Sequence, residues 1–155
     1  MIKWSCKSFD ALTNKELYKI IQLRIKVFAV EQNVVYQDCD NKDFTSYHLT
    51  GSIENEIIAY SRIIPPGISY PEAASIGRVV TAFQVRKQSV GKQLLKKSIE
   101  EVYNLFGTTP IIISAQLYLK RFYESFSFIQ QGESYLEDSI PHIAMVRIFN
   151  SEPIQ

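Results

Sequence analysis

The stretch that decides the fold runs from Ile76 to Phe106 and reads IGRVVTAFQVRKQSVGKQLLKKSIEEVYNLF. Its first part, Ile76 to Thr81, is rich in β-branched residues, which favour a strand. From Val90 onward the apolar residues recur at helical spacing, while lysines and glutamates occupy the other face. The stretch therefore predicts a buried strand, a polar turn and an amphipathic helix, in that order.

The turn between this strand and helix, Arg86 to Lys92, is suited to binding an anion. The first turn of a helix has free backbone N–H groups, and no acidic side chain lies there to compete for them. Arg86 and Lys87 add positive charge next to these donors. A bound phosphate is the functional interpretation, and a plain surface turn is the alternative.

The six residues RKQSVG, 86–91, resemble the coenzyme A pyrophosphate loop of the GNAT N-acyltransferase superfamily, which follows Arg/Gln-x-x-Gly-x-Gly/Ala. Arg86 and Gly91 match that pattern, whereas Ser89 stands where the first glycine is usual. A serine there is harmless if the backbone has a negative φ and costs steric energy if φ is positive. The resemblance implies a diphosphate held by the N–H groups of Gln88 to Lys92.

A second motif follows the short apolar strand predicted at Ile111 to Ile113. Gln116 to Phe128, QLYLKRFYESFSF, is expected to begin a helix and is similar to the GNAT segment Asn-x-x-Ala-x-x-Phe-Tyr-x-x-x-Gly-Phe. The matching residues are Phe122, Tyr123 and Phe128, and the departures are Gln116, Leu119 and Ser127. Two motifs in the right order are more specific than either alone.

Both ends of the chain resemble the ElaA-type branch of this superfamily. The start has Leu23-Arg24, Val27-Phe28 and Glu31-Gln32 before an acidic loop, a block that is also distantly similar to acyl-homoserine-lactone synthases. The end has two predicted strands, Tyr135 to Pro141 and His142 to Ile148, with an acidic-Ile-Pro-His signature. The resemblance thus spans nearly the whole chain.

The first helix is predicted to begin at a capping box, Thr13-Asn14-Lys15-Glu16. Arg24 lies on its mostly apolar face, and a buried arginine is rare unless it is paired. Its expected partner is Glu31 or one of the loop aspartates Asp38, Asp40 and Asp43. A structural ion pair is the alternative to a role for Arg24 in substrate binding.

The remaining pattern completes a mixed α/β (α+β) fold of GNAT type. Ile2 to Ser8 predicts a first strand, and Thr45 to Ile53 with Ile57 to Ile64 predicts an antiparallel hairpin. A right-handed crossover makes the strands at Ile76 and Ile111 parallel. We expect a mostly antiparallel central sheet, flanking helices and a parallel pair that splays to open a ligand slot.

Composition narrows the class of protein. The 155 residues suit one domain, 1–155, and the net charge of +1 gives no reason to expect a nucleic acid or a membrane as partner. No apolar run approaches 18 residues, so a cytoplasmic protein is expected. Two cysteines and two histidines without a ligand pattern argue against a metal.

The resemblance implies acetyl-CoA as co-substrate, with its pantetheine arm along the strand at Val79 to Thr81. The predicted cofactor contacts are Val79, Val80, Thr81, Arg86, Lys87, Gln88, Ser89, Val90, Gly91, Lys92, Gln116 and Phe122. The predicted acceptor contacts are Arg24, Phe28, Glu31, Tyr36 and Arg78.

Three residues are candidates for proton transfer. A tyrosine is protonated at neutral pH, so Tyr123 suits the acid that protonates the leaving thiolate, unless it is only a core aromatic. A lysine-like ammonium costs about 4–5 kcal/mol to deprotonate at pH 7, and Glu31 or His142 is the expected base. His142 is alternatively a hydrogen-bonded strand residue.

The predicted function is direct transfer of an acetyl group from acetyl-CoA to an amine of a small molecule or peptide. Neither Cys6 nor Cys39 is placed to suggest a covalent acyl-enzyme. An acyl-CoA-binding or sensing module without turnover is one alternative, and an acyl-homoserine-lactone-synthase-like enzyme is another. The apolar final strand is compatible with a homodimer.

Overall fold

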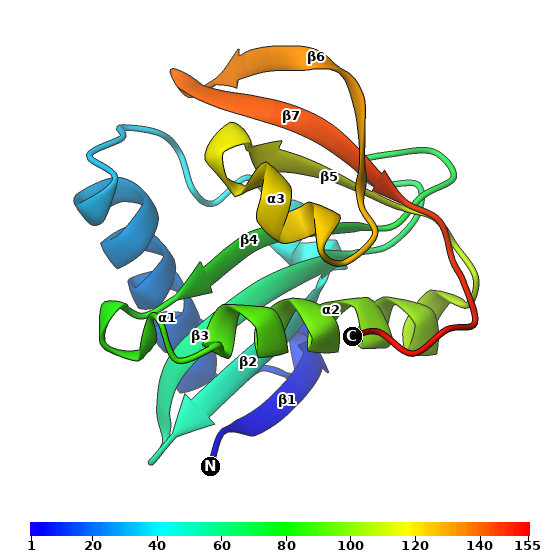
Figure 1. Ribbon diagram of the computed structural model, residues 1–155. Coiled ribbons are helices and arrows are strands. Elements are labelled where there is room, and N and C mark those ends of the chain that lie inside the picture. The colour runs from blue at the N-terminus through cyan, green and yellow to red at the C-terminus, as the bar shows by residue number, and fades with distance from the viewer.

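The computed structural model describes residues 1–155 and contains two β-sheets and three α-helices (Figure 1). The first sheet has the order β1-β2-β3-β4, with β1 Lys3–Ser8, β2 Tyr47–Ile53, β3 Glu56–Ile64 and β4 Ser75–Thr81. The second has the order β5-β7-β6, with β5 Ile111–Gln116, β6 Ile129–Glu137 and β7 Ile140–Arg147. The helices are α1 Asn14–Arg24, α2 Val90–Phe106 and α3 Lys120–Glu124.

The first sheet is antiparallel throughout, and its hairpin forms as predicted. The connection is shorter than expected, because Glu56 already pairs with Ile53 as the first residue of β3. Glu54 and Asn55 alone make the turn, with φ of 49° and 67°. Two positive φ values suit the right-handed twist of the flanking strands.

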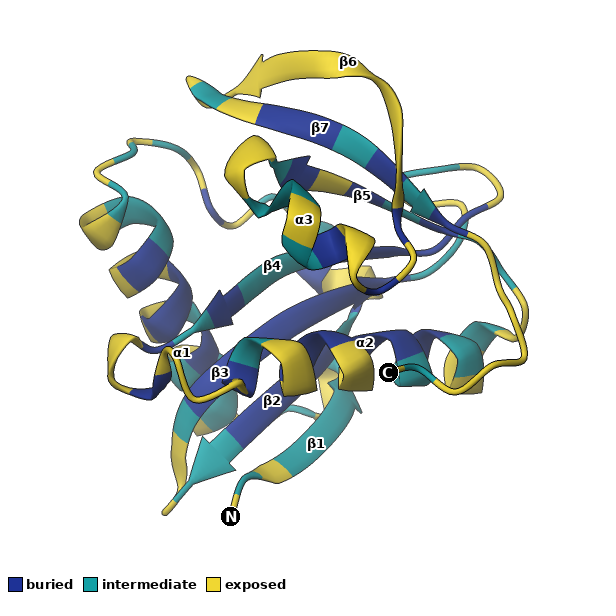
Figure 2. Cartoon of the chain, in the orientation of Figure 1, coloured by how far each residue is buried: buried dark blue, intermediate teal, exposed yellow.

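Helices cover both faces of the first sheet. Side chains of successive strand residues point to opposite faces, so Tyr60 and Ser61 of β3 mark the two sides. The guanidinium of Arg24, the last residue of α1, lies 5.7 Å from the centre of the Tyr60 ring. The Ser61 hydroxyl is 2.7 Å from that of Ser98 in α2. This two-sided cover explains why β3 is buried along most of its length (Figure 2).

Local signals place the two long helices as predicted. The capping box is present: the Thr13 hydroxyl accepts from the Glu16 N–H, and the Glu16 carboxylate accepts from the Thr13 N–H. After α1 the chain continues as a π-helical segment, Ile25–Glu31. The predicted bounds of α2 are confirmed. None of the helices combines the length and apolar character that crossing a lipid bilayer requires.

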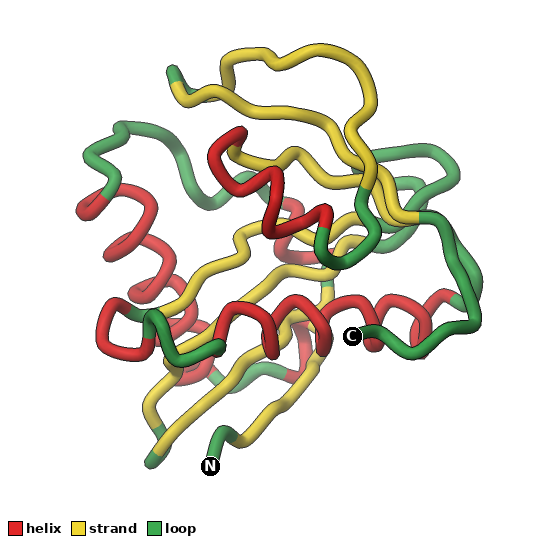
Figure 3. The backbone as a smooth tube through the Cα atoms, in the orientation of Figure 1, coloured by secondary structure: helices red, strands yellow, loops and turns green.

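The splayed parallel pair is confirmed. β4 and β5 meet only where they start, through a parallel bridge between Ala74 and Ile111. There the Ala74 N–H donates to the Pro110 carbonyl and the Ile112 N–H donates to the Ala74 carbonyl, both at 3.0 Å. Beyond this point the strands separate towards their carboxyl ends (Figure 3). The predicted GNAT-like arrangement is therefore the observed fold.

The strand predicted to start at Tyr135 starts at Ile129 as β6, and two further boundaries predicted near the end of the chain are wrong. Gln116 pairs with His142 and ends β5, so the expected helix shrinks to a 3-10 turn followed by α3. The final hairpin turns at Asp138 and Ser139, both with positive φ, so β7 starts at Ile140 and includes Pro141. Cross-strand pairing decided both limits, and pairing leaves no local signal. β6 remains exposed along its whole length (Figure 2).

Candidate functional site

A cleft of about 990 Å³ occupies the space opened by the splayed strands. It is lined by β4 and β5, by the start of α2, by α3 and by the β6–β7 hairpin. Most predicted site residues line it, namely Phe28, Glu31, Tyr36, Arg78, Val79, Val80, Thr81, Arg86, Gly91, Gln116, Phe122, Tyr123 and His142. The fold thus gathers residues from distant parts of the sequence around one cavity.

The start of α2 reaches the cleft through Gly91. No side chain caps the helix, so its first N–H groups keep their hydrogen-bonding capacity for another partner. A Cβ atom on Gly91 would lie 4.0 Å from the Phe122 ring, so this position leaves the backbone open to the cavity. The other predicted loop contacts do not line the cleft: Lys87, Gln88, Ser89 and Lys92 are exposed, and Val90 is buried in the core.

At two positions where the GNAT motifs have glycine, this chain has a serine with a strained backbone conformation. Ser89 has φ of 60° and Ser127 has φ of 65°, both in the left-handed region. Each stands where the resembled GNAT motif carries glycine, which adopts this conformation without a Cβ clash. The departure from the motif at Ser89 is therefore costly rather than mild.

We expect Ser89→Gly and Ser127→Gly each to raise the free energy of unfolding by up to about 1 kcal/mol. Relief of the left-handed strain contributes roughly 1–2 kcal/mol. This gain exceeds the stability that is lost because glycine makes the unfolded chain more flexible. Denaturant unfolding monitors the change. Gln88→Gly is the matched control, because Gln88 is not in the left-handed region. This variant should lower the free energy of unfolding by several tenths of a kcal/mol.

Tyr123 faces both the core and the cleft. Its ring packs edge-on against Phe122 and Phe128, with centroids 5.2 and 5.9 Å away, and the residue is only 6% exposed. The residue also lines the cavity. Burial, helped by Tyr118, raises the phenol pKa above its ordinary value of 10. The group therefore remains a proton donor throughout the neutral range.

Glu31 and Arg86 form an ion pair at the cleft. The Arg86 Nη2 donates to the Glu31 Oε2 at 2.6 Å and to the Thr81 carbonyl at 3.2 Å. Glu31 was predicted to act on the acceptor and Arg86 to add charge at the phosphate. In this arrangement each neutralises the other, so neither is free for its predicted role.

His142 sits in a polar group on the second sheet. Its Nδ1 lies 2.7 Å from the Ile140 carbonyl, which makes Nδ1 the protonated nitrogen, and its Nε2 lies 3.2 Å from the Glu137 Oε2. The Ser114 hydroxyl contacts the same Glu137 oxygen at 3.2 Å and also bonds to Tyr135. The ring is a hydrogen-bonded strand residue, as the alternative interpretation had it, and it also lines the cleft.

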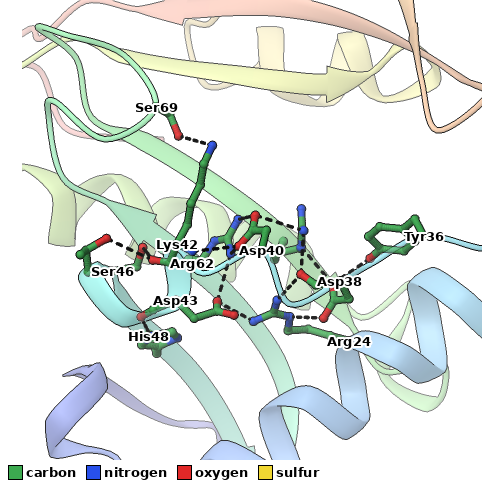
Figure 4. A network of polar contacts seen from close by, with 12 residues as sticks. Arg24, Tyr36, Asp38, Asp40, Lys42, Asp43, Ser46, His48, Arg62 and Ser69 are labelled. Carbon is green, nitrogen blue, oxygen red and sulfur yellow. Dashed lines mark hydrogen bonds and ion pairs between the residues drawn. The ribbon is translucent and has the colours of Figure 1, made fainter.

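The placement of Arg24 corrects its predicted role as a substrate contact. The side chain is fully buried and does not line the cleft. Its Nε donates to Asp38 and its Nη1 to Asp43, both at 2.8 Å (Figure 4). The structural ion pair is thus the observed arrangement, and Glu31 is not its partner.

Arg24 belongs to a larger cluster that ties the acidic loop to the sheet. The Arg–Asp cluster consists of Arg24, Arg62, Arg78, Asp38, Asp40 and Asp43 (Figure 4). Arg62 on β3 donates to Asp40 at 2.7 Å and to Asp43 at 3.0 Å, and Arg78 on β4 donates to Asp38 at 3.0 Å. Three cations balance three carboxylates, so the loop forms one wall of the cleft without leaving a net buried charge.

Electrostatics within the Arg–Asp cluster keep the carboxylates of Asp40 and Asp43 ionised. Burial works to raise the pKa of Asp40, but the hydrogen bonds and charge of Arg62, helped by Arg78, lower it from 3.8 to about 2. The pKa of Asp43 is also lowered, because Arg24 and Arg62 outweigh its burial. These aspartates therefore bind their arginines throughout the physiological range.

Sequence reasoning missed Arg62, Lys42 and Glu137 as lining residues of the cleft. Arg62 shares the alternation of Tyr60 and Ile64 in β3, which places it on an apolar face of the strand but does not indicate its acidic partners. Glu137 is the acidic residue of the ElaA-type ending, and that signature was the one available signal. Lys42 belongs to none of the recognised motifs, so no signal marked it.

Comparisons with known proteins agree with this arrangement. A family model described as acetyltransferase (GNAT) domain matches residues 20–149. Protein ElaA of Escherichia coli (strain K12) is 40% identical over 149 residues, which cover 95% of this chain and 97% of ElaA. The crystal structure of E. coli ElaA superposes with a TM-score of 0.89 and covers 95% of this chain and 99% of that one.

Two further solved structures share the fold. An acyl-CoA N-acyltransferase from Pseudomonas aeruginosa has a TM-score of 0.91 at 38% identity, covering 95% of this chain and 99% of that one. A GNAT family acetyltransferase from Elizabethkingia anophelis with acetyl-CoA bound has a TM-score of 0.68 at 16% identity, covering 96% and 98%. The chain belongs to the GNAT acetyltransferase family, in its ElaA-type branch.

Proposed function

We propose that this GNAT protein transfers an acetyl group from acetyl-CoA to the amine of a small molecule or peptide. The family supports acyl transfer in general, and the donor and acceptor are the proposal. One observation carries it: a single cleft joins the uncapped start of α2 to the buried phenol of Tyr123. An anion site and a proton donor on one cavity are what transfer from a coenzyme A thioester requires.

The lining suits the co-substrate at three points. N–H groups at the start of α2 suit a diphosphate, and the missing side chain at Gly91 leaves room for a close approach. Val79 to Thr81 line the cavity on the open edge of β4, whose main-chain groups can bond a pantetheine arm, apart from the Thr81 carbonyl that accepts from Arg86. The structure of the E. anophelis acetyltransferase has acetyl-CoA bound on the same fold.

Each proton in the proposed transfer has a residue to hold it. The acceptor amine gives up a proton to a base, its nitrogen attacks the thioester carbonyl carbon, and the C–S bond breaks. Tyr123 then supplies a proton to the departing thiolate sulfur, whose thiol form has a pKa of about 8.5. We favour His142 over Glu31 as the base, because Arg86 holds the Glu31 carboxylate.

A screen of acetyl-CoA consumption against a panel of amines tests this function. Released thiol is measured with each amine, and acetylated product is identified by mass. We expect release to depend on both protein and amine. Coenzyme A binding without thiol release from any amine would instead support the acyl-CoA-binding module and refute the proposed enzyme.

Gly91→Leu is expected to weaken coenzyme A binding at least about tenfold, since the new side chain would project into the cleft beside Phe122. The same change should stabilise α2 by up to about 0.8 kcal/mol, because leucine is a better helix former than glycine. Calorimetric titration and denaturant unfolding measure the two effects. Lys87→Ala, which removes one exposed charge, should weaken binding by no more than a few-fold.

A further inference from the structure

The cleft contains one cation that no carboxylate of the protein neutralises. Of the four lysines and arginines in its lining, Arg62 and Arg78 bind aspartates of the Arg–Asp cluster and Arg86 binds Glu31. Lys42 has no acidic partner, and its Nζ donates to the Ser69 hydroxyl at 3.0 Å. Figure 4 shows its side chain turned away from the aspartates and toward Ser69.

A different wall of the same cleft has two carboxylates that no lysine or arginine neutralises. Glu137 and Asp138, at the end of β6 and in the turn after it, both line the cavity and pair with no lysine or arginine. Glu137 instead faces His142 at 3.2 Å. With Nδ1 of His142 donating to Ile140, a neutral ring and the carboxylate present two acceptors to each other. A ligand ammonium, with three donors, satisfies both.

The two walls belong to the same cleft of about 990 Å³. Tyr70 directly follows Ser69 and also lines the cleft. The pKa of the Tyr70 phenol is raised, mainly by burial and to a smaller extent by Tyr135 and Glu137. The loop that holds Ser69 and the hairpin that holds Glu137 therefore line the same cavity, and a ligand in it has access to both.

A half-buried ammonium without a counter-ion is unfavourable, and an anionic group of the ligand would remove that cost at Lys42. A polyamine would instead bring a like charge towards Lys42, and a simple monoamine would leave it unpaired. The leftover charges of the cleft thus match a ligand with an anion at one end and an amine at the other.

We infer that the acceptor is an amino acid, with its carboxylate bound by Lys42 and Ser69 and its amine held at Glu137 beside His142. The inference rests on the proposed acetyl transfer and names the substrate class of that reaction. In the balanced step, the ammonium loses a proton to Nε2 of His142, and the amine nitrogen forms the new amide. The C–S bond breaks, Tyr123 protonates the sulfur, and the second proton that the nitrogen gives up as the amide forms restores the Tyr123 phenol.

The test compares each of the twenty common L-amino acids with its carboxamide, which keeps the amine and removes the negative charge. We expect kcat/KM for thiol release from acetyl-CoA to favour the best acid over its amide by at least about tenfold, as a hydrogen bond between charged groups implies. Lys42→Met should bring that ratio close to one, and Lys42→Arg should retain part of it. Lys15→Met, an exposed lysine at the start of α1, is the matched control and should keep the wild-type ratio.

Failure of the inference and failure of the proposed function give different results. Acetylation of amides as fast as acids, or an acid preference that survives Lys42→Met, overturns the amino-acid assignment and leaves the acetyltransferase in place. Absence of thiol release from amino acids, amides and simple amines alike overturns both. If Lys42→Met does not fold, Ser69→Ala replaces it, and the acid preference should fall in the same direction.

Discussion

Tyr123→Phe is expected to slow acetyl transfer about 100-fold, at the lower end of the 10²–10⁴-fold that positioned acids contribute. The change removes one hydroxyl and keeps the ring, so the edge-on contacts with Phe122 and Phe128 should survive. Water replaces the lost acid in part, which limits the loss. Single-turnover measurement of the transfer step isolates this effect, and coenzyme A affinity should stay within a few-fold of wild type.

The size of the rate loss separates acid catalysis from packing, and this loss should be the same at every pH up to 10. Burial raises the phenol pKa above 10, so ionisation of Tyr123 should not reduce the wild-type rate below that pH. The transfer rate of the Phe variant should therefore depend on pH as the wild-type rate does up to pH 10, and it should be about 100-fold lower throughout. Tyr118→Phe removes the hydroxyl of a neighbouring tyrosine that is 75% exposed, and it should change the rate no more than twofold to threefold. Full activity in Tyr123→Phe would make Tyr123 a packing residue only.

Arg24→Met is expected to lower the free energy of unfolding by about 3–5 kcal/mol, the usual cost of breaking a buried ion pair from one side. The change leaves Asp38 and Asp43 without the guanidinium that each contacts at 2.8 Å. Urea unfolding at neutral pH measures the loss. The control is Lys19→Met, whose ion pair with Glu56 is exposed and should contribute less than about 1 kcal/mol. A loss of similar size in both variants would contradict the structural role of Arg24.

The stabilisation from the Arg–Asp cluster should also depend on pH. The folded-state pKa values of Asp40 and Asp43 lie below the ordinary 3.8, with that of Asp40 at about 2. Their contribution is therefore complete above about pH 4 and is lost as the pH falls towards 2. In Arg24→Met the dependence should become shallower, because the pKa of Asp43 loses one of the charges that lower it.

Local patterns in the sequence were enough to predict much of the fold. The capping box at Thr13 and the helical spacing from Val90 to Phe106 are short-range signals, and the structure keeps both. The splay between β4 and β5 followed from the handedness of a crossover connection together with the family resemblance. Each of these inferences needs only neighbours in sequence or a general rule of topology.

Non-local contacts were beyond the reach of the sequence. The bond from Arg24 to Asp43 spans 19 residues and that from Arg78 to Asp38 spans 40, and no periodicity marks either pair. The loop offered several acidic partners for Arg24, and only the folded chain selects among them. The same limit applies to the site. That Lys42 has no acidic partner is known only once the ion pairs of the other cations in the cleft are known.

Coenzyme A binding by calorimetric titration tests the central claim most directly, namely that a coenzyme A thioester occupies the cleft with its diphosphate at the start of α2. We predict binding at micromolar to low millimolar concentration, and at least tenfold weaker binding of pantetheine, which lacks the diphosphate. This loss of affinity should be similar in size to the loss that Gly91→Leu causes for intact coenzyme A. Absence of heat with coenzyme A throughout this range, or equal affinity for pantetheine, would contradict the account.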